Sequence, residues 1–348
     1  MAYKIVLWYL LSTLITTYAF MAAIPLLRMR YADAFACVLK HSGAPLELLL
    51  AKVGLNESLL LKRDAFVPFT LVSRLASLAV SYTDNPGFSA LAGATPLDKH
   101  SDFGHNLVVA PTLMQALQRF SLTAKSELTC ASFVLKRDVE GCWFSFGVID
   151  GTAMEVQQHE LYRIAMLVQI VRWVGQHSWL PTKIRLQSKL LVDRNTIGLL
   201  EQSELVFAAN ETAVLIPDSL LYKRTPPKKH CAAPVYRADL TGFDFRQSLA
   251  QVMASFAPEY FFQPQAMAEL LGMEWAQFKR LLARHGINYR HMLEQLRIDA
   301  AQQLLEQRAI NEVATELGYS STAQFSRSFK RICGVSPANY LKIEFESA

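Results

Sequence analysis

The chain has 348 residues and a formal net charge of +5, from 35 lysines and arginines against 30 aspartates and glutamates. This length is sufficient for two domains, and the mildly basic balance is compatible with nucleic acid without being diagnostic of it. The histidines show no metal-ligand spacing, and the cysteines, none of which forms a Cys-x-x-Cys pair, are Cys37, Cys130, Cys142, Cys231 and Cys333. We therefore expect no metal site and no cofactor, and small buried thiols in a reducing cytoplasm.

The beginning of the chain is the one compositional anomaly. Ile5–Leu27 contains no charged residue and is long enough to span a bilayer, but it lacks the small-residue cleavage site of a signal peptide. Three alternatives remain open. Residues 1–20 are an upstream extension from a wrongly assigned start, or the segment is a buried N-terminal helix, or it is a membrane anchor. Arg28 and Arg30 would suit an anchor that leaves the rest of the chain in the cytoplasm.

Helical and extended patterns alternate in the next part of the chain. Helical spacing is found at Ala32–Lys40, Pro45–Lys52, Thr70–Tyr82, Thr112–Lys125 and Val156–His177. Extended patterns are found at Leu128–Lys136, Cys142–Ile149, Thr182–Leu190, Leu205–Ala208 and Ala213–Ile216. We expect Thr112 to cap its helix, and the turn Asp138–Gly141 to join the first two strands as a hairpin. The alternation predicts an α+β domain with a sheet, and neither a helical bundle nor a Rossmann unit.

A basic, proline-containing segment marks a domain boundary. Lys223–Lys229 holds two prolines and four basic residues, which predicts an extended and solvated linker. It is either a soluble hinge or an additional contact to nucleic-acid phosphates.

The C-terminal part contains the same small unit twice, about 46 residues apart. Ala268–Gly272 and Ala314–Gly318 each begin with Ala and end with Gly, and in each copy a helix with a Phe follows, at Phe278 and Phe325. The small Ala lets two helices approach, and Gly takes the left-handed turn between them. Two such units in tandem are a specific signal for helix-turn-helix motifs.

The second helix of each unit presents one face to solvent. Its buried stripe is expected to be Phe278, Leu281 and Leu282 in the first copy, and Phe325, Phe329 and Ile332 in the second. Arg280 and Arg327 then occupy equivalent exposed positions, and Arg is the side chain best suited to bidentate contact with guanine. Their neighbours can reach phosphates or base edges. The residues expected at DNA are Trp275, Ala276, Gln277, Lys279, Arg280, Arg284, Thr322, Ala323, Gln324, Ser326, Arg327, Lys330 and Arg331.

Tyr289–Gln307 joins the two units and is predicted to be one continuous helix. It contains neither Pro nor Gly, and its apolar residues at helical spacing are Met292, Leu293, Leu296, Ala300, Leu304 and Leu305. A helix of about 19 residues would be roughly 28 Å long. Successive major grooves on one face of B-DNA recur about every 34 Å. One chain could therefore place both recognition helices into consecutive turns of a duplex.

These features closely resemble the DNA-binding domain of AraC/XylS-type transcription regulators. The resemblance covers about Phe245–Leu341 and is carried by Leu271–Met273, Phe278–Arg280, Gly286, Phe325–Lys330, Gly334–Pro337 and Tyr340. The sequence departs from the family at Glu274, where a short polar cap is usual, and at Leu341, where a basic residue is frequent. An acidic Glu274 near the phosphate backbone could weaken binding or exclude some DNA sequences.

The N-terminal domain resembles that of the ornithine-utilisation type of AraC regulator, often described as arabinose-binding-like. The similarity is carried by Leu49–Gly54, Val67–Pro68, Asp102–Gly104, Ala110–Leu113 and Ser121–Lys125. It implies an effector-binding domain that can also form a homodimer, but it neither identifies the ligand nor supports a sugar. The family further implies promoter DNA, RNA polymerase and a small-molecule effector as partners.

The sequence as a whole predicts a cytoplasmic, nucleoid-associated regulator that binds specific DNA under the control of an effector. The alternative is a membrane-tethered sensor-regulator anchored by residues 5–27. We expect no enzyme, because no activated cysteine cluster, acid–base pair or phosphate-loop spacing is evident. The expected parts are an apolar segment (1–27), an α+β effector domain (28–221), a linker (222–238) and an all-α DNA-binding domain (239–345), which contains a first helix-turn-helix (264–285), a linker helix (289–307) and a second helix-turn-helix (310–333).

Overall fold

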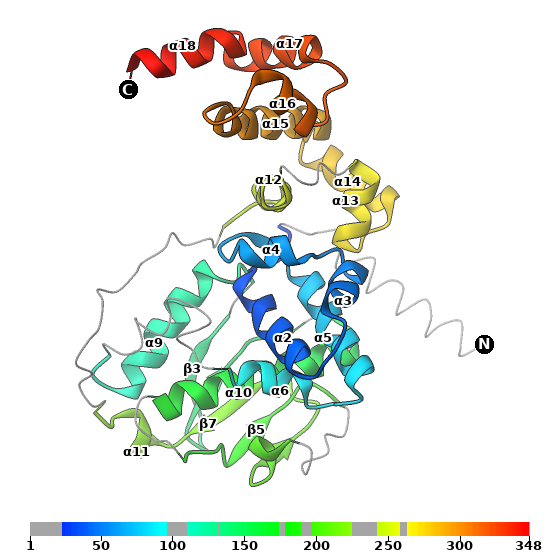
Figure 1. Ribbon diagram of the computed structural model, residues 1–348. Coiled ribbons are helices and arrows are strands. Elements are labelled where there is room, and N and C mark those ends of the chain that lie inside the picture. The colour runs from blue at the N-terminus through cyan, green and yellow to red at the C-terminus, as the bar shows by residue number, and fades with distance from the viewer. Residues whose placement is uncertain are drawn as a thin grey trace. The chain divides into compact units, whose positions relative to one another are not determined.

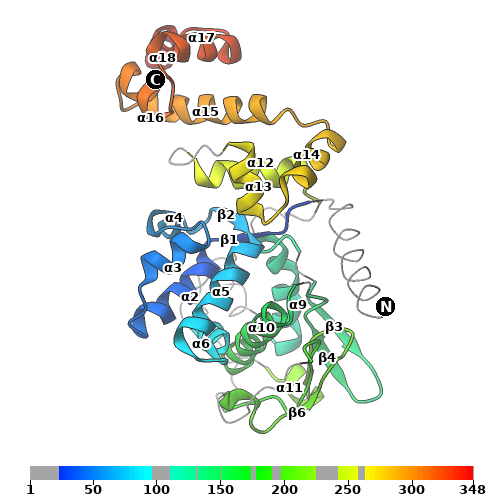
Figure 2. The same ribbon diagram turned by 90° about the vertical axis from the view of Figure 1, so that its right-hand side faces the viewer.

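The computed structural model describes residues 23–95, 110–130, 132–149, 151–173, 178–189, 197–224, 242–257 and 263–347, with side chains up to residue 343. The chain divides into two compact units, shown in two views in Figures 1 and 2. The N-terminal unit is formed by Pro25–Phe243, and the C-terminal unit contains Asp244–Ala348.

The N-terminal unit is built on a five-stranded sheet in the order β3–β4–β7–β5–β6; Figure 1 labels β3, β5 and β7, and Figure 2 labels β4 and β6. Its strands are β3 (Val134–Arg137), β4 (Cys142–Ser145), β5 (Lys183–Arg185), β6 (Glu204–Val206) and β7 (Ala213–Ile216). Neighbouring strands are antiparallel, except for the parallel pair β5–β6. A separate antiparallel pair joins β1 (Leu26–Arg28) to β2 (Phe66–Pro68). The expected α+β class of this domain is confirmed.

Helix α10 (Ala153–Trp173) forms the centre of this unit, because other elements cover it on nearly every side. Glu160 of α10 fastens the helix to the sheet region, where its carboxylate accepts hydrogen bonds from the Thr212 hydroxyl at 2.7 Å and the Gln187 amide at 2.6 Å. Helix α6 (Phe88–Gly93) crosses α10 so closely that a Cβ on Gly93 would lie 2.3 Å from the Tyr162 carbonyl oxygen. The remaining helical segments of the unit are α2 (Arg30–His41), α3 (Leu46–Lys52), α4 (Glu57–Leu61), α5 (Phe69–Thr83), α9 (Leu113–Thr123), η1 (Ala124–Ser126), η2 (Gly198–Leu200) and α11 (Asp218–Leu221).

A cluster of phenylalanines fills the space between α9 and the sheet. The Phe120 ring of α9 lies 5.0 Å from the Phe133 ring and 6.1 Å from the Phe144 ring of β4, measured between centroids. Phe144 in turn meets Phe146 edge to face at 5.4 Å. All four rings are buried. As expected, Thr112 caps α9 by accepting a hydrogen bond from the Gln115 amide.

The C-terminal unit is entirely helical in its described part (Figure 2). Its helices are α12 (Phe245–Phe256), α13 (Pro264–Leu271), α14 (Trp275–Arg284), α15 (Tyr289–Leu305), α16 (Ile310–Glu316), α17 (Thr322–Cys333) and α18 (Pro337–Ser347). The sequence patterns had not indicated α12 or α18. Helix α12 begins with a capping box, in which Asp244 and Gln247 each bond to the backbone of the other.

Several strand predictions were too long. The extended pattern Leu128–Lys136 forms a strand only from Val134, and Leu128 makes a single isolated bridge to Leu27. The pattern Cys142–Ile149 ends as a strand at Ser145. Gly147 then takes a left-handed backbone with φ of 69°, and a Cβ there would lie 2.9 Å from the Ser132 side chain. Among the described residues of the pattern Thr182–Leu190, only Lys183–Arg185 form a strand. The pattern Leu205–Ala208 corresponds to β6, which begins one residue earlier, at Glu204, and ends at Val206.

The expected roles of Arg28 and Arg30 beside an anchor were wrong. Leu26–Arg28 is strand β1, so the end of the apolar segment belongs to the N-terminal unit. Both arginines are buried, with ion pairs to Glu127 at 3.6 and 3.7 Å and to Asp64. Residues 1–22 lie outside the described part. No helix within the described ranges is long and apolar enough to cross a membrane.

The expectation of uniformly buried cysteines was also wrong. Cys142 is buried within β4 and Cys333 is half-buried, but Cys37 and Cys130 are exposed. Cys37 lies on α2 at a position that faces solvent, where the His41 imidazole lies 3.7 Å from its sulfur. Cys231 lies outside the described residues, as do Asp102–Gly104 and most of the linker 222–238.

Candidate functional site

Two helix-turn-helix units in the C-terminal unit share one backbone geometry. Gly272 and Gly318 both adopt the left-handed conformation, with φ of 73° and 74°. In each copy the residue after the Gly donates a backbone hydrogen bond to the Ala five positions earlier: Met273 to Ala268 at 2.8 Å, and Tyr319 to Ala314 at 3.0 Å. Both alanines are buried, as close helix approach requires. The sequence repeat is therefore a repeat of structure.

The buried face of the first unit agrees with the sequence prediction. Phe278, Leu281 and Leu282 of α14 are buried, and the Phe278 ring packs against Phe245 of α12 and Tyr289 of α15 at 6.4 and 6.0 Å. Because α13 and α14 share this core, the outer face of α14 is held in a defined orientation.

The core of the second unit is formed by α15, α16 and α17. Its buried residues are Ile298, Ala301, Leu305, Val313, Ala314, Leu317, Phe325 and Phe329. Ile332, expected inside, is only partly buried. Along α15 the fully buried positions include Ile298 and Ala301, whereas the predicted Met292, Leu296, Ala300 and Leu304 are half-buried. The start of α15 packs on the first unit through Tyr289 and Phe278, whereas Ile298, Ala301 and Leu305 belong to the core of the second unit.

Arg280 and Arg327 occupy matched exposed positions on α14 and α17, each two residues after a fully buried Phe. Within the described part of the chain, neither guanidinium has an ion pair or a hydrogen bond, and the same is true of the Lys330 ammonium. The backbone on the same face is sterically open, because Ala276 and Ala323 are exposed and carry only a methyl group. The arrangement offers two separate cationic helix faces to an anionic partner.

Some of the other predicted contact residues already have partners within the chain. Arg331 forms an ion pair with Glu294 of α15, and Glu294 also accepts a 2.6 Å hydrogen bond from Ser328. These contacts hold the pKa of Glu294 below its usual value, the Arg331 hydrogen bond contributing most. The Gln324 amide oxygen accepts from the backbone and hydroxyl of Ser320.

The other predicted residues differ in exposure. Lys279 lies over the Trp275 ring, with its nitrogen 5.4 Å from the centroid. Thr322 and Arg284 are exposed, while Gln277 and Ser326 are half-buried. The predicted set is therefore divided into outward cations, half-buried polar groups, and residues that also stabilise the unit itself.

Helix α15 lies between the two helix-turn-helix units in the chain, so its length sets the separation of α14 from α17 along the sequence. It has 17 residues, which corresponds to roughly 25 Å at 1.5 Å per residue. Its N-cap Asn288 accepts a hydrogen bond from the His291 amide. The helix ends at Leu305, two residues earlier than expected.

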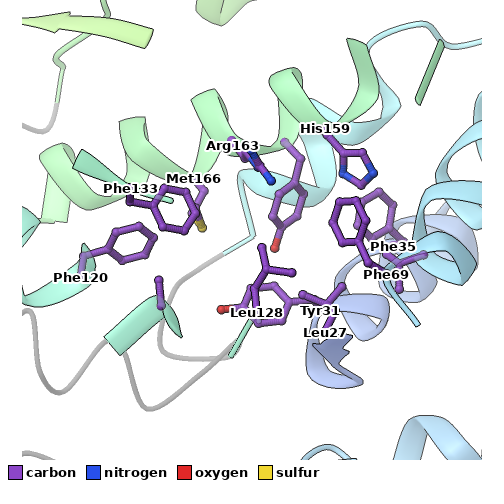
Figure 3. A pocket seen from close by; sticks show the side chains of 13 residues that line it. Leu27, Tyr31, Phe35, Phe69, Phe120, Leu128, Phe133, His159, Arg163 and Met166 are labelled. Carbon is purple, nitrogen blue, oxygen red and sulfur yellow. The ribbon is translucent and has the colours of Figure 1, made fainter. Parts of the chain in front are cut away.

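The N-terminal unit contains a cavity of about 40 Å³ (Figure 3). Its lining is mostly hydrocarbon and consists of Leu27, Tyr31, Phe35, Phe69, Val72, Phe120, Ala124, Leu128, Phe133, His159, Tyr162, Arg163 and Met166. His159, Arg163 and Met166 lie at helical spacing on one face of α10 and project to the same space, as Figure 3 shows. None of these residues was predicted as a site.

Burial sets the protonation of the polar groups in this lining. The His159 ring stacks on Phe69 at 4.3 Å, and its Nε2 lies 2.5 Å from the Ser73 hydroxyl. Burial, with the nearby charge of Arg163, lowers the pKa of His159 to about 3, so this imidazole is neutral at pH 7. Burial likewise raises the pKa of Tyr31 and Tyr162, so both hydroxyls keep their protons.

Comparison with known proteins identifies both units. The family described as the arabinose-binding domain of AraC transcription regulators matches residues 43–224, more than half of the chain. The protein belongs to the AraC family of transcription regulators. A second family, described as a helix-turn-helix domain, matches residues 267–343 of this AraC-family chain and includes both duplicated units.

Curated relatives match over shorter stretches. An uncharacterised HTH-type transcriptional regulator of Haemophilus influenzae is 31% identical over 102 residues, which is 28% of this chain and 34% of the relative. An uncharacterised HTH-type transcriptional regulator of Mycobacterium tuberculosis is 36% identical over 72 residues, which is 20% of this chain and 21% of the relative. The AraC-family chain thus spans about a third or less of the length of these relatives. The crystal structure of the transcriptional regulator CdpR from Pseudomonas aeruginosa aligns over 76% of this chain and 90% of its own, at 21% identity. The TM-score of this alignment is 0.36, which is too low to support a conclusion about the fold.

Proposed function

We propose that the protein binds promoter DNA through α14 and α17, which enter consecutive major grooves of one duplex, and that a small molecule in the N-terminal unit controls this activity. The observation that carries the proposal is the matched pair Arg280 and Arg327, exposed and without an intramolecular partner in the described residues. Membership in a family of transcription regulators supports it.

The contacts of this interface fall into two kinds. Arg280 and Arg327 are the candidates for reading base edges, because a guanidinium can bond both O6 and N7 of guanine. Lys279, Lys330 and the polar ends of the two helices are the candidates for phosphate contacts, which set register and affinity without reading sequence. Arg331 belongs with the second kind at most, since Glu294 neutralises it.

The spacing between the two units supports the use of consecutive grooves. Helix α15 is roughly 25 Å long. Because α14 and α17 flank it, the distance between the axes of these two helices should exceed the length of α15 by part of their own width. Successive grooves on one face of DNA are about 34 Å apart. We further propose that the N-terminal unit forms a homodimer and that RNA polymerase is contacted at the promoter.

Selection of preferred sites from random duplex DNA by the full chain tests the proposal. The expected result is a site with two conserved blocks about one helical turn apart, bound more weakly as salt rises. Binding that shows no sequence preference, or a site with a single conserved block, would contradict the two-groove arrangement. A fragment from Gly242 onward should bind the same site if α12–α18 hold all the base contacts.

A further inference from the structure

The cavity of the N-terminal unit contains a buried positive charge for which the described residues supply no carboxylate. Arg163 projects into it from α10 and is only 6% exposed. Among the described residues its one hydrogen bond runs from Nη1 to the Phe146 carbonyl oxygen at 3.0 Å, and no carboxylate lies within ion-pair distance. Its guanidinium also lies 5.8 Å from the centroid of the Phe133 ring. A guanidinium has five N–H donors, so most of the hydrogen-bonding capacity of Arg163 is unused.

The nearby acidic groups are already occupied. Glu127, which precedes the lining residue Leu128, lies between Arg28 and Arg30 at 3.6 and 3.7 Å. Glu160 accepts hydrogen bonds from Thr212 and from the backbone of Gln187. Neither carboxylate forms an ion pair with Arg163; the charge of Glu160, three residues earlier on α10, favours the charged guanidinium from beyond ion-pair distance. A buried charge without an ion-paired counter-ion is costly, and this favours an anionic ligand.

The remainder of the lining specifies the rest of the ligand. Leu27, Phe69, Val72 and Ala124 offer hydrocarbon only, Met166 adds a thioether, and His159 is neutral and already bonded to Ser73. Besides Arg163, the lining's other polar groups are the hydroxyls of Tyr31 and Tyr162, so a sugar would leave most of its hydroxyl groups without partners. An aliphatic tail would instead gain apolar burial.

The size of the cavity limits the length of that tail. A buried water needs about 10–15 Å³ of such space, and a dry cavity that binds benzene has about 150 Å³. The volume here, about 40 Å³, lies between these values. It is well below the volume that holds a benzene ring, so we expect room for no more than two or three carbons beyond a carboxylate paired to Arg163.

We propose that this cavity binds a short-chain aliphatic monocarboxylate, with the carboxylate paired to Arg163 and the tail among Leu27, Phe69 and Val72. This inference rests on the proposed function, in which the N-terminal unit holds the effector. It also explains why an arginine occupies a position on α10 that is enclosed by phenylalanine rings.

The test compares three probes of nearly equal size on the full-length protein: butyrate, butyramide and n-butylammonium. Thermal unfolding and calorimetry are measured over a concentration series. Butyrate should raise the melting temperature in a saturable way, because a ligand that binds only the folded state stabilises it. Its affinity should exceed that of butyramide by about tenfold or more, since only the anion pairs with the buried charge. Equal effects of acid and amide, or no effect of either propionate or butyrate, would overturn the proposal.

Three variants locate the binding. Arg163→Met should abolish the preference for butyrate over butyramide, and Arg163→Lys, which keeps the charge, should weaken binding while the preference persists. Ala124→Leu fills the cavity from its apolar side and should block butyrate with Arg163 intact. If Arg163→Met fails to fold because the Phe146 carbonyl loses its donor, the other two variants decide. Undiminished butyrate binding by Ala124→Leu together with Arg163→Lys would place the ligand elsewhere and refute the proposal.

A parallel DNA-binding measurement separates this inference from the function on which it rests. A full chain that selects a two-block DNA site but ignores butyrate would refute the carboxylate site and leave the regulator intact. A chain that binds butyrate through Arg163 but selects no DNA site would do the reverse.

Discussion

Replacing Arg280 or Arg327 with Ala is the most direct test of the DNA contacts proposed for α14 and α17. Each substitution removes one exposed guanidinium and leaves the buried stripe of Phe278 or Phe325 untouched. Neither arginine has an internal partner in the described residues, so the free energy of unfolding should stay within about 0.5 kcal/mol of wild type. Any loss of DNA binding then reports on the interface and not on the fold.

The expected loss is about 1–3 kcal/mol for each base contact, which corresponds to roughly 5- to 150-fold in the dissociation constant. The loss should fall on one block of the DNA site for Arg280→Ala and on the other block for Arg327→Ala. Because the two arginines belong to separate helix-turn-helix units, their effects should add in the double variant. Fluorescence anisotropy with the selected site, and with each block scrambled in turn, measures these effects.

Two further variants serve as controls for charge. Lys330→Ala removes an exposed cation from α17 and should weaken all DNA sequences alike, with the salt slope reduced by about one. Lys342→Ala removes an exposed cation from α18 and matches the change in net charge. If both arginine variants keep the wild-type preference at every position of the site, or lose only the uniform affinity seen with Lys330→Ala, these arginines do not read bases.

Other predictions follow from single contacts. Gly318→Ala should cost about 1–2 kcal/mol, measured by urea unfolding, because the left-handed φ of 74° is strained for Ala although the added Cβ meets no atom. Gly93→Ala should cost more, about 3 kcal/mol, since its Cβ would collide with the Tyr162 carbonyl oxygen; equal costs for the two would show that α6 can move. Arg331→Ala should reduce DNA affinity less than Lys330→Ala in the same anisotropy assay, because Glu294 already neutralises Arg331. The free energy of unfolding should fall on acidification below about pH 6.5, by about 2 kcal/mol from pH 7 to pH 5, because His159 binds a proton in the unfolded chain but stays neutral in the folded one, where its pKa is about 3. In His159→Gln this part of the pH dependence should be absent. The same pH dependence in the variant and the wild type would contradict a buried, neutral His159.

The turns of the DNA-binding unit were predictable because their chemistry is local. A left-handed residue and a close helix crossing need a Gly and an Ala at fixed spacing, and the sequence contains both twice. The hydrogen bonds from Met273 to Ala268 and from Tyr319 to Ala314 follow from that spacing alone. Phe278 and Phe325 were found inside for the same reason, since one helical period relates them to their neighbours.

The cavity could not be predicted, because no local period relates its residues. Its lining comes from β1, α2, α5, α9 and α10 and from the chain between them, and most of it is indistinguishable from ordinary core. The position of Arg163 in the cavity could not be predicted for a further reason. Leu161, Ile164, Ala165 and Val168 recur at the spacing of one apolar helix face, and Arg163 does not belong to that face. In the folded unit α10 is buried on nearly all sides, and Arg163 is enclosed with it.

The two helix-turn-helix units differ in the helices that support them. In the first, α12 packs Phe245 on Phe278, and Arg246 donates to the Gly286 carbonyl oxygen at 2.8 Å. In the second, α18 places Tyr340 5.4 Å from the Phe329 ring. The supporting residues are not repeated in the sequence, which explains why α12 and α18 gave no signal in a search for repeats. The duplication therefore covers only the helix-turn-helix units themselves, whose geometry the proposed DNA contact would constrain. Each unit is stabilised by a different additional helix, α12 or α18.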